Sequence, residues 1–127
     1  MLQNDLYTIE SLEKEEDSAK AGISLNVSHP IFKGHFPGQP VLPGACMLQM
    51  VKEIMELVTG KSLQLQKANH LKFISLIDPT KNHLLILNLE HMVSEEGLVV
   101  RATILRDAEV CLKFNGVFLA APFRAWV

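Results

Sequence analysis

The chain has 127 residues and a mass of 14.2 kDa, which fits one globular domain spanning residues 1–127. Hydrophobic residues make up 48% and charged residues 20%, which excludes disordered, collagen-like and low-complexity chains. A net charge of −2 offers no basic footprint for nucleic acid. No apolar run reaches the roughly 20 residues that cross a bilayer, and no secretory signal follows Met1. We therefore expect a cytoplasmic protein without membrane insertion.

The first part of the chain predicts one strand. Residues 21–27 alternate between apolar and small or polar side chains, with Ile23, Leu25 and Val27 on one face. Before this strand, residues 10–20 contain five acidic residues and two lysines. Such a charged segment indicates a solvated loop or a strand at the edge of a sheet.

A segment rich in proline and glycine precedes the only predicted helix. Residues 29–44 hold four prolines and three glycines, which predict an ordered loop instead of a regular helix or a central strand. Residues 45–59 then run without a breaker to the stop signal Gly60. The polar side chains of this helix form one narrow stripe, which consists of Gln49, Lys52, Glu53 and Glu56. The remaining residues are mostly apolar, so we expect a helix that is buried on most of its sides.

The second half of the chain is predicted to be rich in strands. Its runs of β-branched and leucine residues are separated by turn sequences, and they are residues 70–77, 83–93, 98–105 and 110–120. One buried helix followed by an antiparallel meander is an α+β pattern. In this pattern the sheet wraps the helix in order to bury it.

Two residues around the proline-rich segment suit acyl chemistry. His35 lies between a glycine and a Phe-Pro-Gly turn, where a histidine held in place can act as a general base near neutral pH. Gly44 opens the helix, so its backbone N–H suits a carbonyl oxygen on which negative charge develops. Without further context, a structural or solvated histidine and a plain Pro-Gly turn before a helix are the favoured interpretations.

The string GHFPGQPVLPG at residues 34–44, followed by an apolar helix, resembles the active-site segment of the 3-hydroxyacyl-[acyl-carrier-protein] dehydratases of bacterial fatty acid synthesis. The pattern of that family is H-F-P-G-x-P-x-x-P-G, then an acidic residue on the helix and a glutamine one turn later. A looser similarity covers residues 23–120 and includes Leu71-Lys72-Phe73. The resemblance implies a hot-dog fold, in which an antiparallel sheet wraps one long helix and two copies share a continuous sheet.

The resemblance also implies a reaction, the removal of water from a 3-hydroxyacyl thioester to give the trans-2-enoyl thioester. His35 would take the proton from C2, the N–H of Gly44 would hold the thioester carbonyl, and the substrate would contact Phe36, Gly38 and Pro43. The acyl chain would be carried by acyl carrier protein or coenzyme A, and no cofactor or metal is implied. The expected assembly is a homodimer, a higher oligomer built from dimers, or a heterodimer with an active homologue. In such dimers the histidine and the acid of one site come from different subunits.

The predicted helix departs from the family pattern, because Gln49 stands at the position of the acid and Glu53 at that of the glutamine. An amide can hydrogen-bond a hydroxyl but has no proton to give at neutral pH. Glu53 takes over as the acid in one interpretation, while Gln49 orients the substrate hydroxyl. In a second the chain is a weakened or non-catalytic acyl-binding subunit, and in a third residual activity uses Gln49 and His35 alone.

Two further alternatives involve the same helix. Thioester hydrolysis, which occurs on the hot-dog fold, would need a water activated near Glu53. The polar stripe is also compatible with a hydrated seam that has no catalytic part, in which Lys52 and Glu56 form an i,i+4 pair.

Overall fold

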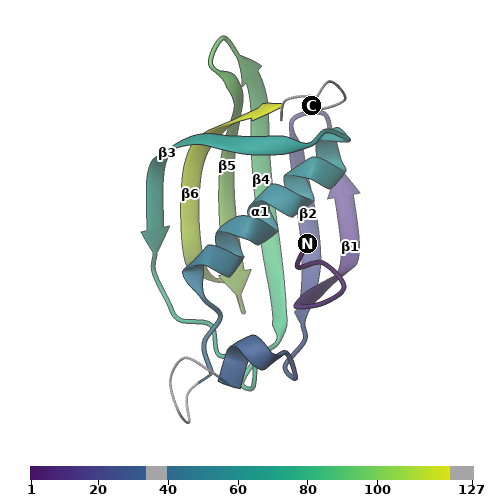
Figure 1. Ribbon diagram of the computed structural model, residues 1–127, viewed down its shortest axis with the longest axis vertical. Helices are drawn as coiled ribbons and strands as arrows, with labels where there is room; N and C mark the ends of the chain where they lie inside the picture. The colour runs from purple at the N-terminus through teal and green to yellow at the C-terminus, as the bar shows by residue number, and fades with distance from the viewer. Residues whose placement is uncertain (34–39, 121–127) are drawn as a thin grey trace, which may run out of the picture.

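The computed structural model describes residues 1–33 and 40–120, in which six antiparallel strands form one sheet around a single α-helix (Figure 1). The strand order is β1-β2-β4-β5-β6-β3. The strands are β1 (Tyr7–Lys14), β2 (Ser18–Leu25), β3 (Leu63–Phe73), β4 (Leu84–Ser94), β5 (Gly97–Arg106) and β6 (Glu109–Ala120). A short 3-10 helix, η1 (Pro30–Lys33), precedes the α-helix, α1 (Gly44–Thr59). The α+β class that the sequence predicts is confirmed.

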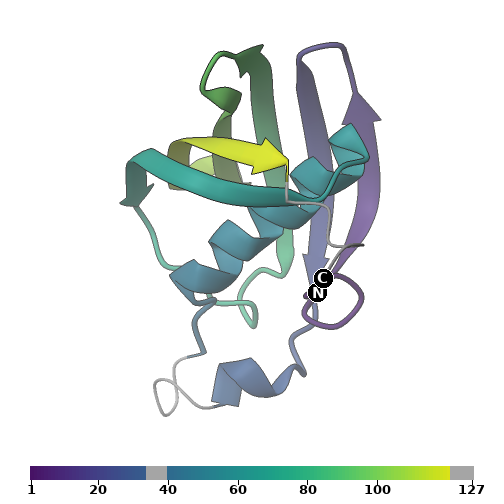
Figure 2. The same cartoon turned by 45° about the horizontal axis from the view of Figure 1, so that its top comes forward.

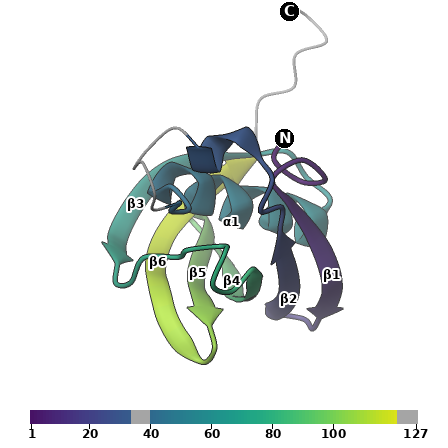
Figure 3. The ribbon, with the colours of Figure 1, turned by 90° about the horizontal axis from the view of Figure 1, so that it is seen from below.

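The sheet curves around α1, which lies against its concave face (Figures 2 and 3). Side chains alternate along the central strands, so that Leu85, Leu87 and Leu89 of β4 are buried while their neighbours face outward. The apolar face of α1 completes this core with Met47, Met50, Val51, Ile54 and Met55. One core therefore joins the helix to the inner face of the sheet.

The bounds of α1 agree with the sequence prediction to within one residue. Pro43 precedes the helix in an extended conformation. Gly60 follows it with a φ of 71°, which glycine adopts without a steric penalty, and donates its N–H to the carbonyl of Glu56. The prediction that the helix is buried on most of its sides agrees with the structure, since only Ala45 and Leu57 of α1 are exposed. The sheet covers one side of the helix and leaves the other side partly open.

The two edges of the sheet differ from the sequence expectations. The acidic residues 10–20 lie on β1, on the turn after it and at the start of β2, which confirms the interpretation as an edge strand. At the other edge, β3 begins seven residues before the predicted run 70–77 and ends at Phe73. Only Leu63 of β3 is buried, while Leu65, Leu71 and Phe73 are exposed. This edge of the sheet therefore presents apolar side chains and unpaired backbone groups to the surroundings.

No helix in the described parts of the chain is long and apolar enough to span a membrane.

Candidate active site

Gly44 lies at an apolar pocket of about 360 Å³ at the start of α1. The pocket is formed by the chain that leads into the helix, by the first turn of the helix and by the end of β3 with the residues after it. Its lining consists of Val41, Leu42, Pro43, Gly44, Met47, Phe73, Ile74, Ser75 and Leu76. Two residues that the sequence assigns to the substrate site, Pro43 and Gly44, are thus brought together with the end of β3.

The backbone N–H of Gly44 belongs to the first turn of α1, beside this pocket. None of the described residues accepts a hydrogen bond from its N–H, whereas the N–H groups of Cys46 and Met47 both donate to the carbonyl of Pro43. The first turn of a helix also carries a partial positive charge. A carbonyl oxygen that gains negative charge would be stabilised at this position.

The ring of Phe73 explains why residue 44 is a glycine. A Cβ atom at residue 44 would lie 2.6 Å from Cζ and 2.8 Å from Cε1 of Phe73, far inside van der Waals contact. Phe73 therefore packs directly on the backbone of Gly44 and forms one wall of the pocket. The sequence indicates Phe73 only as part of the similar strand, because nothing local in the chain connects it to Gly44.

Gln49 and Glu53 form a hydrogen-bonded pair one turn apart on α1. The Nε2 atom of Gln49 donates to Oε2 of Glu53 at 2.9 Å. Glu53 is 0% exposed and is the one buried charged side chain among the described residues. Gln49 itself is half-buried, and neither residue lines the pocket at Gly44.

The N-terminal segment, residues 2–7, covers Glu53. The backbone N–H of Leu2 donates to Oε2 at 2.8 Å, and the N–H of Gln3 donates to Oε1 at 2.9 Å. The hydroxyl of Tyr7 donates to Oε1 at 2.9 Å. Together with the bond from Gln49, each carboxylate oxygen accepts two hydrogen bonds. Figure 1 shows this segment beside α1.

These donors determine the charge of Glu53. Burial by itself raises the pKa of the Glu53 carboxyl, but the hydrogen bonds from Leu2, Gln49, Gln3 and Tyr7 together outweigh it and lower the pKa below its ordinary value. The pKa of Tyr7 is raised, chiefly by burial and then by its hydrogen bond to Glu53 and by that negative charge. At neutral pH the pair is therefore a carboxylate and a neutral phenol, and such a carboxylate holds no proton to donate.

The polar stripe of α1 is not a hydrated seam at Glu53, as one interpretation of the sequence suggested, because the N-terminal segment excludes water from that side chain. Glu56 accepts the backbone N–H of Leu63 at 2.8 Å. Among the described residues it forms no ion pair with Lys52. The remaining sequence-predicted site residues, His35, Phe36 and Gly38, lie outside the described residues.

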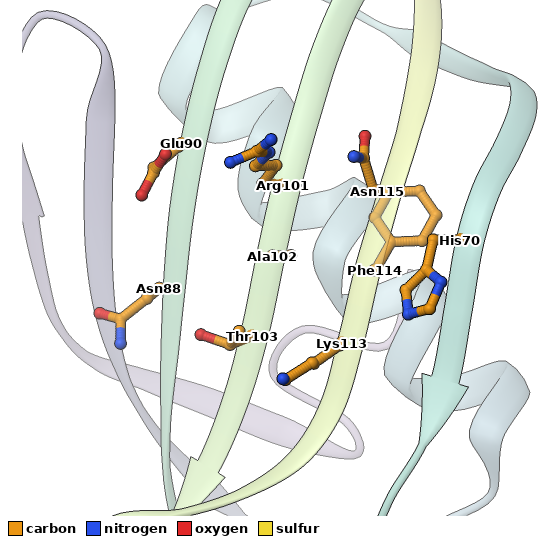
Figure 4. A pocket seen from close by; sticks show the side chains of 9 residues that line it. All are labelled: His70, Asn88, Glu90, Arg101, Ala102, Thr103, Lys113, Phe114 and Asn115. Atoms are coloured by element: carbon orange, nitrogen blue, oxygen red, sulfur yellow. The ribbon is translucent and has the colours of Figure 1, made fainter.

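A second pocket, of about 270 Å³, lies on the outer face of β3, β4, β5 and β6 (Figure 4). It mixes charges of both signs and is lined by His70, Asn88, Glu90, Arg101, Ala102, Thr103, Lys113, Phe114 and Asn115. None of the residues predicted from the sequence to act on substrate lies here. No group of metal-binding side chains occurs in the described parts of the chain either.

Comparison with known families and sequences finds similarity to dehydratases. Residues 11–111 match the family model described as ApeI-like, ApeI dehydratase. The chain is 37% identical over 68 residues to the 3-hydroxyacyl-[acyl-carrier-protein] dehydratase FabZ of Haemophilus influenzae, which covers 54% of this chain and 45% of that one. It is 29% identical over 109 residues to FabZ of Vibrio atlanticus, which covers 86% of this chain and 68% of that one. The match thus spans less than half the length of the first of these relatives.

Comparison with solved structures shows the fold. The dehydratase heterocomplex ApeI:P from Xenorhabdus doucetiae superposes with a TM-score of 0.72 at 19% identity, covering 87% of this chain and 96% of that one. The conserved protein PA5202 from Pseudomonas aeruginosa gives a TM-score of 0.64 at 14% identity, covering 91% and 88%. Across residues 1–33 and 40–120, six antiparallel strands wrap one α-helix, which is the hot-dog fold that the resemblance implied.

Proposed function

Because the chain belongs to the family of ApeI-like dehydratases, we propose that it eliminates water from a 3-hydroxyacyl thioester in fatty acid or related lipid biosynthesis. The acyl chain would be delivered by acyl carrier protein or coenzyme A, and the product would be the trans-2-enoyl thioester. The observation that carries this proposal is the apolar pocket at the start of α1, into which the backbone of Gly44 is built. An apolar pocket beside a helix N-terminus suits a substrate that is apolar except at its thioester.

The proposed roles follow from the chemistry of each group. The N–H of Gly44 holds the thioester carbonyl as negative charge builds on its oxygen, which acidifies C2 of the substrate. His35 takes the proton from C2, and the electron pair left behind forms the C2–C3 double bond as the C3–O bond breaks. Phe36, Gly38 and Pro43 contact the acyl chain or its carrier arm.

The leaving hydroxyl needs a proton, and the surroundings of Glu53 favour the interpretation that uses Gln49 and His35 alone. Both oxygens of Glu53 already accept two hydrogen bonds from the protein. Gln49 therefore orients the hydroxyl, and the imidazolium of His35 returns the proton taken from C2, so that water leaves. One imidazole then has to serve as both base and acid. A separate, positioned general acid is worth up to about 10²–10⁴-fold, so this chain is expected to turn over more slowly than relatives that carry an acid at the position of Gln49.

We further propose that β3 pairs with β3 of a second subunit and extends the sheet across a dimer. The apolar side chains of Leu65, Leu71 and Phe73 are exposed on this edge, and pairing would bury them. The two subunits are copies of this chain in the first candidate assembly. A heterodimer is the second candidate, since the similar structure from Xenorhabdus doucetiae is a heterocomplex. Light scattering measures the mass in solution of the wild type and of Leu71→Lys, which places a charge on the exposed edge strand β3. If Leu71→Lys remains a dimer, the proposed pairing of β3 with β3 is overturned.

The reaction is tested with purified protein and 3-hydroxyacyl thioesters of acyl carrier protein and of coenzyme A. Enoyl absorbance and thiol release are followed together in the same sample. Formation of the enoyl thioester without free thiol, lost in His35→Ala, is the expected result. Release of free thiol would instead indicate a hot-dog thioesterase. If neither product forms, the chain is an acyl-binding subunit, and the assay is repeated with an active homologue present.

A further inference from the structure

Glu53 is a buried charge that the proposed reaction leaves without a task. Among the described residues no lysine, arginine or histidine forms an ion pair with it. Its charge is met by four hydrogen-bond donors, two of which are backbone N–H groups from residues about 50 positions away in the chain. A buried carboxylate without such donors would be strongly unfavourable. The four donors therefore compensate the buried charge and hold the carboxylate in place.

The N-terminal segment that supplies these donors is itself tightly folded. The N–H of Leu6 donates to the carbonyl of Leu2 at 2.8 Å, and the N–H of Asn4 donates to the carbonyl of Tyr7 at 2.6 Å. Leu6 and Tyr7 are both buried in the core, with at most 1% of either exposed. Their burial fixes the turn that directs the N–H groups of Leu2 and Gln3 at the carboxylate. Glu53 consequently has little freedom to change its conformation.

The fixed carboxylate of Glu53 determines which way the side-chain amide of Gln49 is turned. Because a carboxylate only accepts hydrogen bonds, the Gln49 amide must present its N–H₂ group to Glu53. The carbonyl oxygen of the amide then faces the other way and can only accept. If residue 53 were a glutamine, as the family pattern has it, the amide of Gln49 would find a partner in either orientation.

We propose that Glu53 is a positioning residue, braced by residues 2–7, that holds Gln49 with its Oε1 atom as the acceptor for the 3-hydroxyl of the bound substrate. This inference rests on the proposed function, since it requires a 3-hydroxyacyl ligand beside Gln49. The hydroxyl keeps its proton and donates a hydrogen bond through it to Oε1, so that a lone pair of the hydroxyl oxygen is directed elsewhere. In the proposed reaction this oxygen takes its second proton from the imidazolium of His35 as the C3–O bond breaks, and water leaves. The exchange of Glu and Gln on this helix thus converts a proton donor into a fixed acceptor.

The proposal is tested by binding, so that it does not depend on turnover. Two non-hydrolysable analogues of an acyl thioester are compared, one with the 3-hydroxyl and one without it, in wild type, Glu53→Gln and Glu56→Gln. We expect the wild type and the Glu56→Gln control to prefer the hydroxylated analogue by about tenfold, the factor typical of one hydrogen bond. Glu53→Gln should reduce this preference to about twofold, because the side-chain amide of Gln49 can then adopt either of its two orientations. A merely structural loss would weaken both analogues equally and leave the preference unchanged, which overturns the proposal.

A second measurement covers the case in which Glu53→Gln does not fold. In wild-type protein labelled with ¹⁵N-glutamine, the side-chain amide protons of Gln49 that bond Glu53 should exchange slowly and keep their shift when the hydroxylated analogue binds. The resonance is assigned with Gln49→Met. An amide signal that moves to the position of a solvated glutamine on binding means that Gln49 has released Glu53, and this overturns the inference.

The outcomes separate this inference from the proposed function. One outcome is that the preference for the hydroxylated analogue depends on Glu53 although the chain forms no enoyl product. This outcome supports the positioning role and rejects the dehydratase activity. Dehydration by the wild type with a preference that survives Glu53→Gln rejects the positioning role alone. Failure of both analogues to bind rejects both.

Discussion

The first turn of α1 and its middle are both part of the candidate site, but they are built by opposite means. Residue 44 has no side chain, and the ring of Phe73 fills the space that a Cβ atom would take. An apolar pocket lies beside it. At Glu53 a charge is present in the core, and four donors surround it. The first turn therefore depends on shape and tolerates little added volume, whereas the middle depends on hydrogen bonds and tolerates little change in polarity.

The largest expected effect comes from removing the charge of Glu53 in the middle of α1. Glu53→Gln should lower the free energy of unfolding by about 3 kcal/mol, because an amide N–H₂ group then faces donors that need an acceptor. The control Glu56→Gln makes the same chemical change three residues further along the helix, where the side chain is half-buried and accepts a single N–H. It should lose less than about 1 kcal/mol. Urea denaturation measures both, and equal losses would mean that the carboxylate of Glu53 has no special environment.

Added volume at the first turn should have the next largest effect. Gly44→Ala places a Cβ atom within 2.8 Å of two atoms of the Phe73 ring, so the ring must move. We expect a loss of about 1–2 kcal/mol in unfolding free energy, with a lower kcat/KM because the pocket wall is displaced. The double variant with Phe73→Leu should regain most of the stability. If Gly44→Ala alone is as stable and active as the wild type, the contact does not shape the pocket.

Removal of one donor from the middle should cost less than loss of the acceptor. Tyr7→Phe deletes the hydroxyl that donates to Oε1 of Glu53 and retains the three other bonds. The expected loss is about 1 kcal/mol, measured by urea denaturation. A loss as large as that of Glu53→Gln would show that Tyr7, and not the backbone of residues 2 and 3, holds the carboxylate.

The smallest expected effect is the pH dependence of stability, which only the middle of α1 should show. The pKa of Glu53 is lower in the folded protein than the ordinary value of 4.5, since its hydrogen bonds favour the charged form. Its contribution to stability is therefore fully present above pH 4.5 and is lost as the pH falls through the folded pKa. The gap in unfolding free energy between wild type and Glu53→Gln, measured at pH 7, 4 and 3, should narrow as the pH falls, by less than the loss expected for Tyr7→Phe. A gap that stays constant would mean that the pKa of Glu53 is not shifted.

The sequence predicts the parts of the site that depend on neighbours along the chain. Pro43, Gly44 and Gly60 mark the ends of α1 locally, and the helix has those bounds within one residue. The helical spacing of four also places Gln49 and Glu53 within reach of each other, and the hydrogen bond between them is present. These features need no knowledge of the rest of the chain.

The strand predictions failed where burial is one-sided or weak. The sequence indicates β1 only as one of two interpretations of the acidic residues 10–20, because most of its side chains are exposed and the strand shows little apolar alternation. The first part of β3 was missed for the same reason, since all its residues after Leu63 are exposed in the single chain. An edge strand is held mainly by backbone hydrogen bonds to one neighbour, and such bonds leave little trace in the side-chain pattern.

Local sequence thus determined the helix, its two ends and the residues aligned along it, because helix signals act over three or four positions. Only the tertiary structure decided what those residues experience. Leu2 and Glu53 are separated by 51 positions, so no local pattern reveals that the carboxylate is buried and anionic. The same holds for Phe73 and Gly44, which the sheet brings together across the first turn of the helix. Folding supplies these contacts, and they determine whether a side chain can give a proton or only hold one in place.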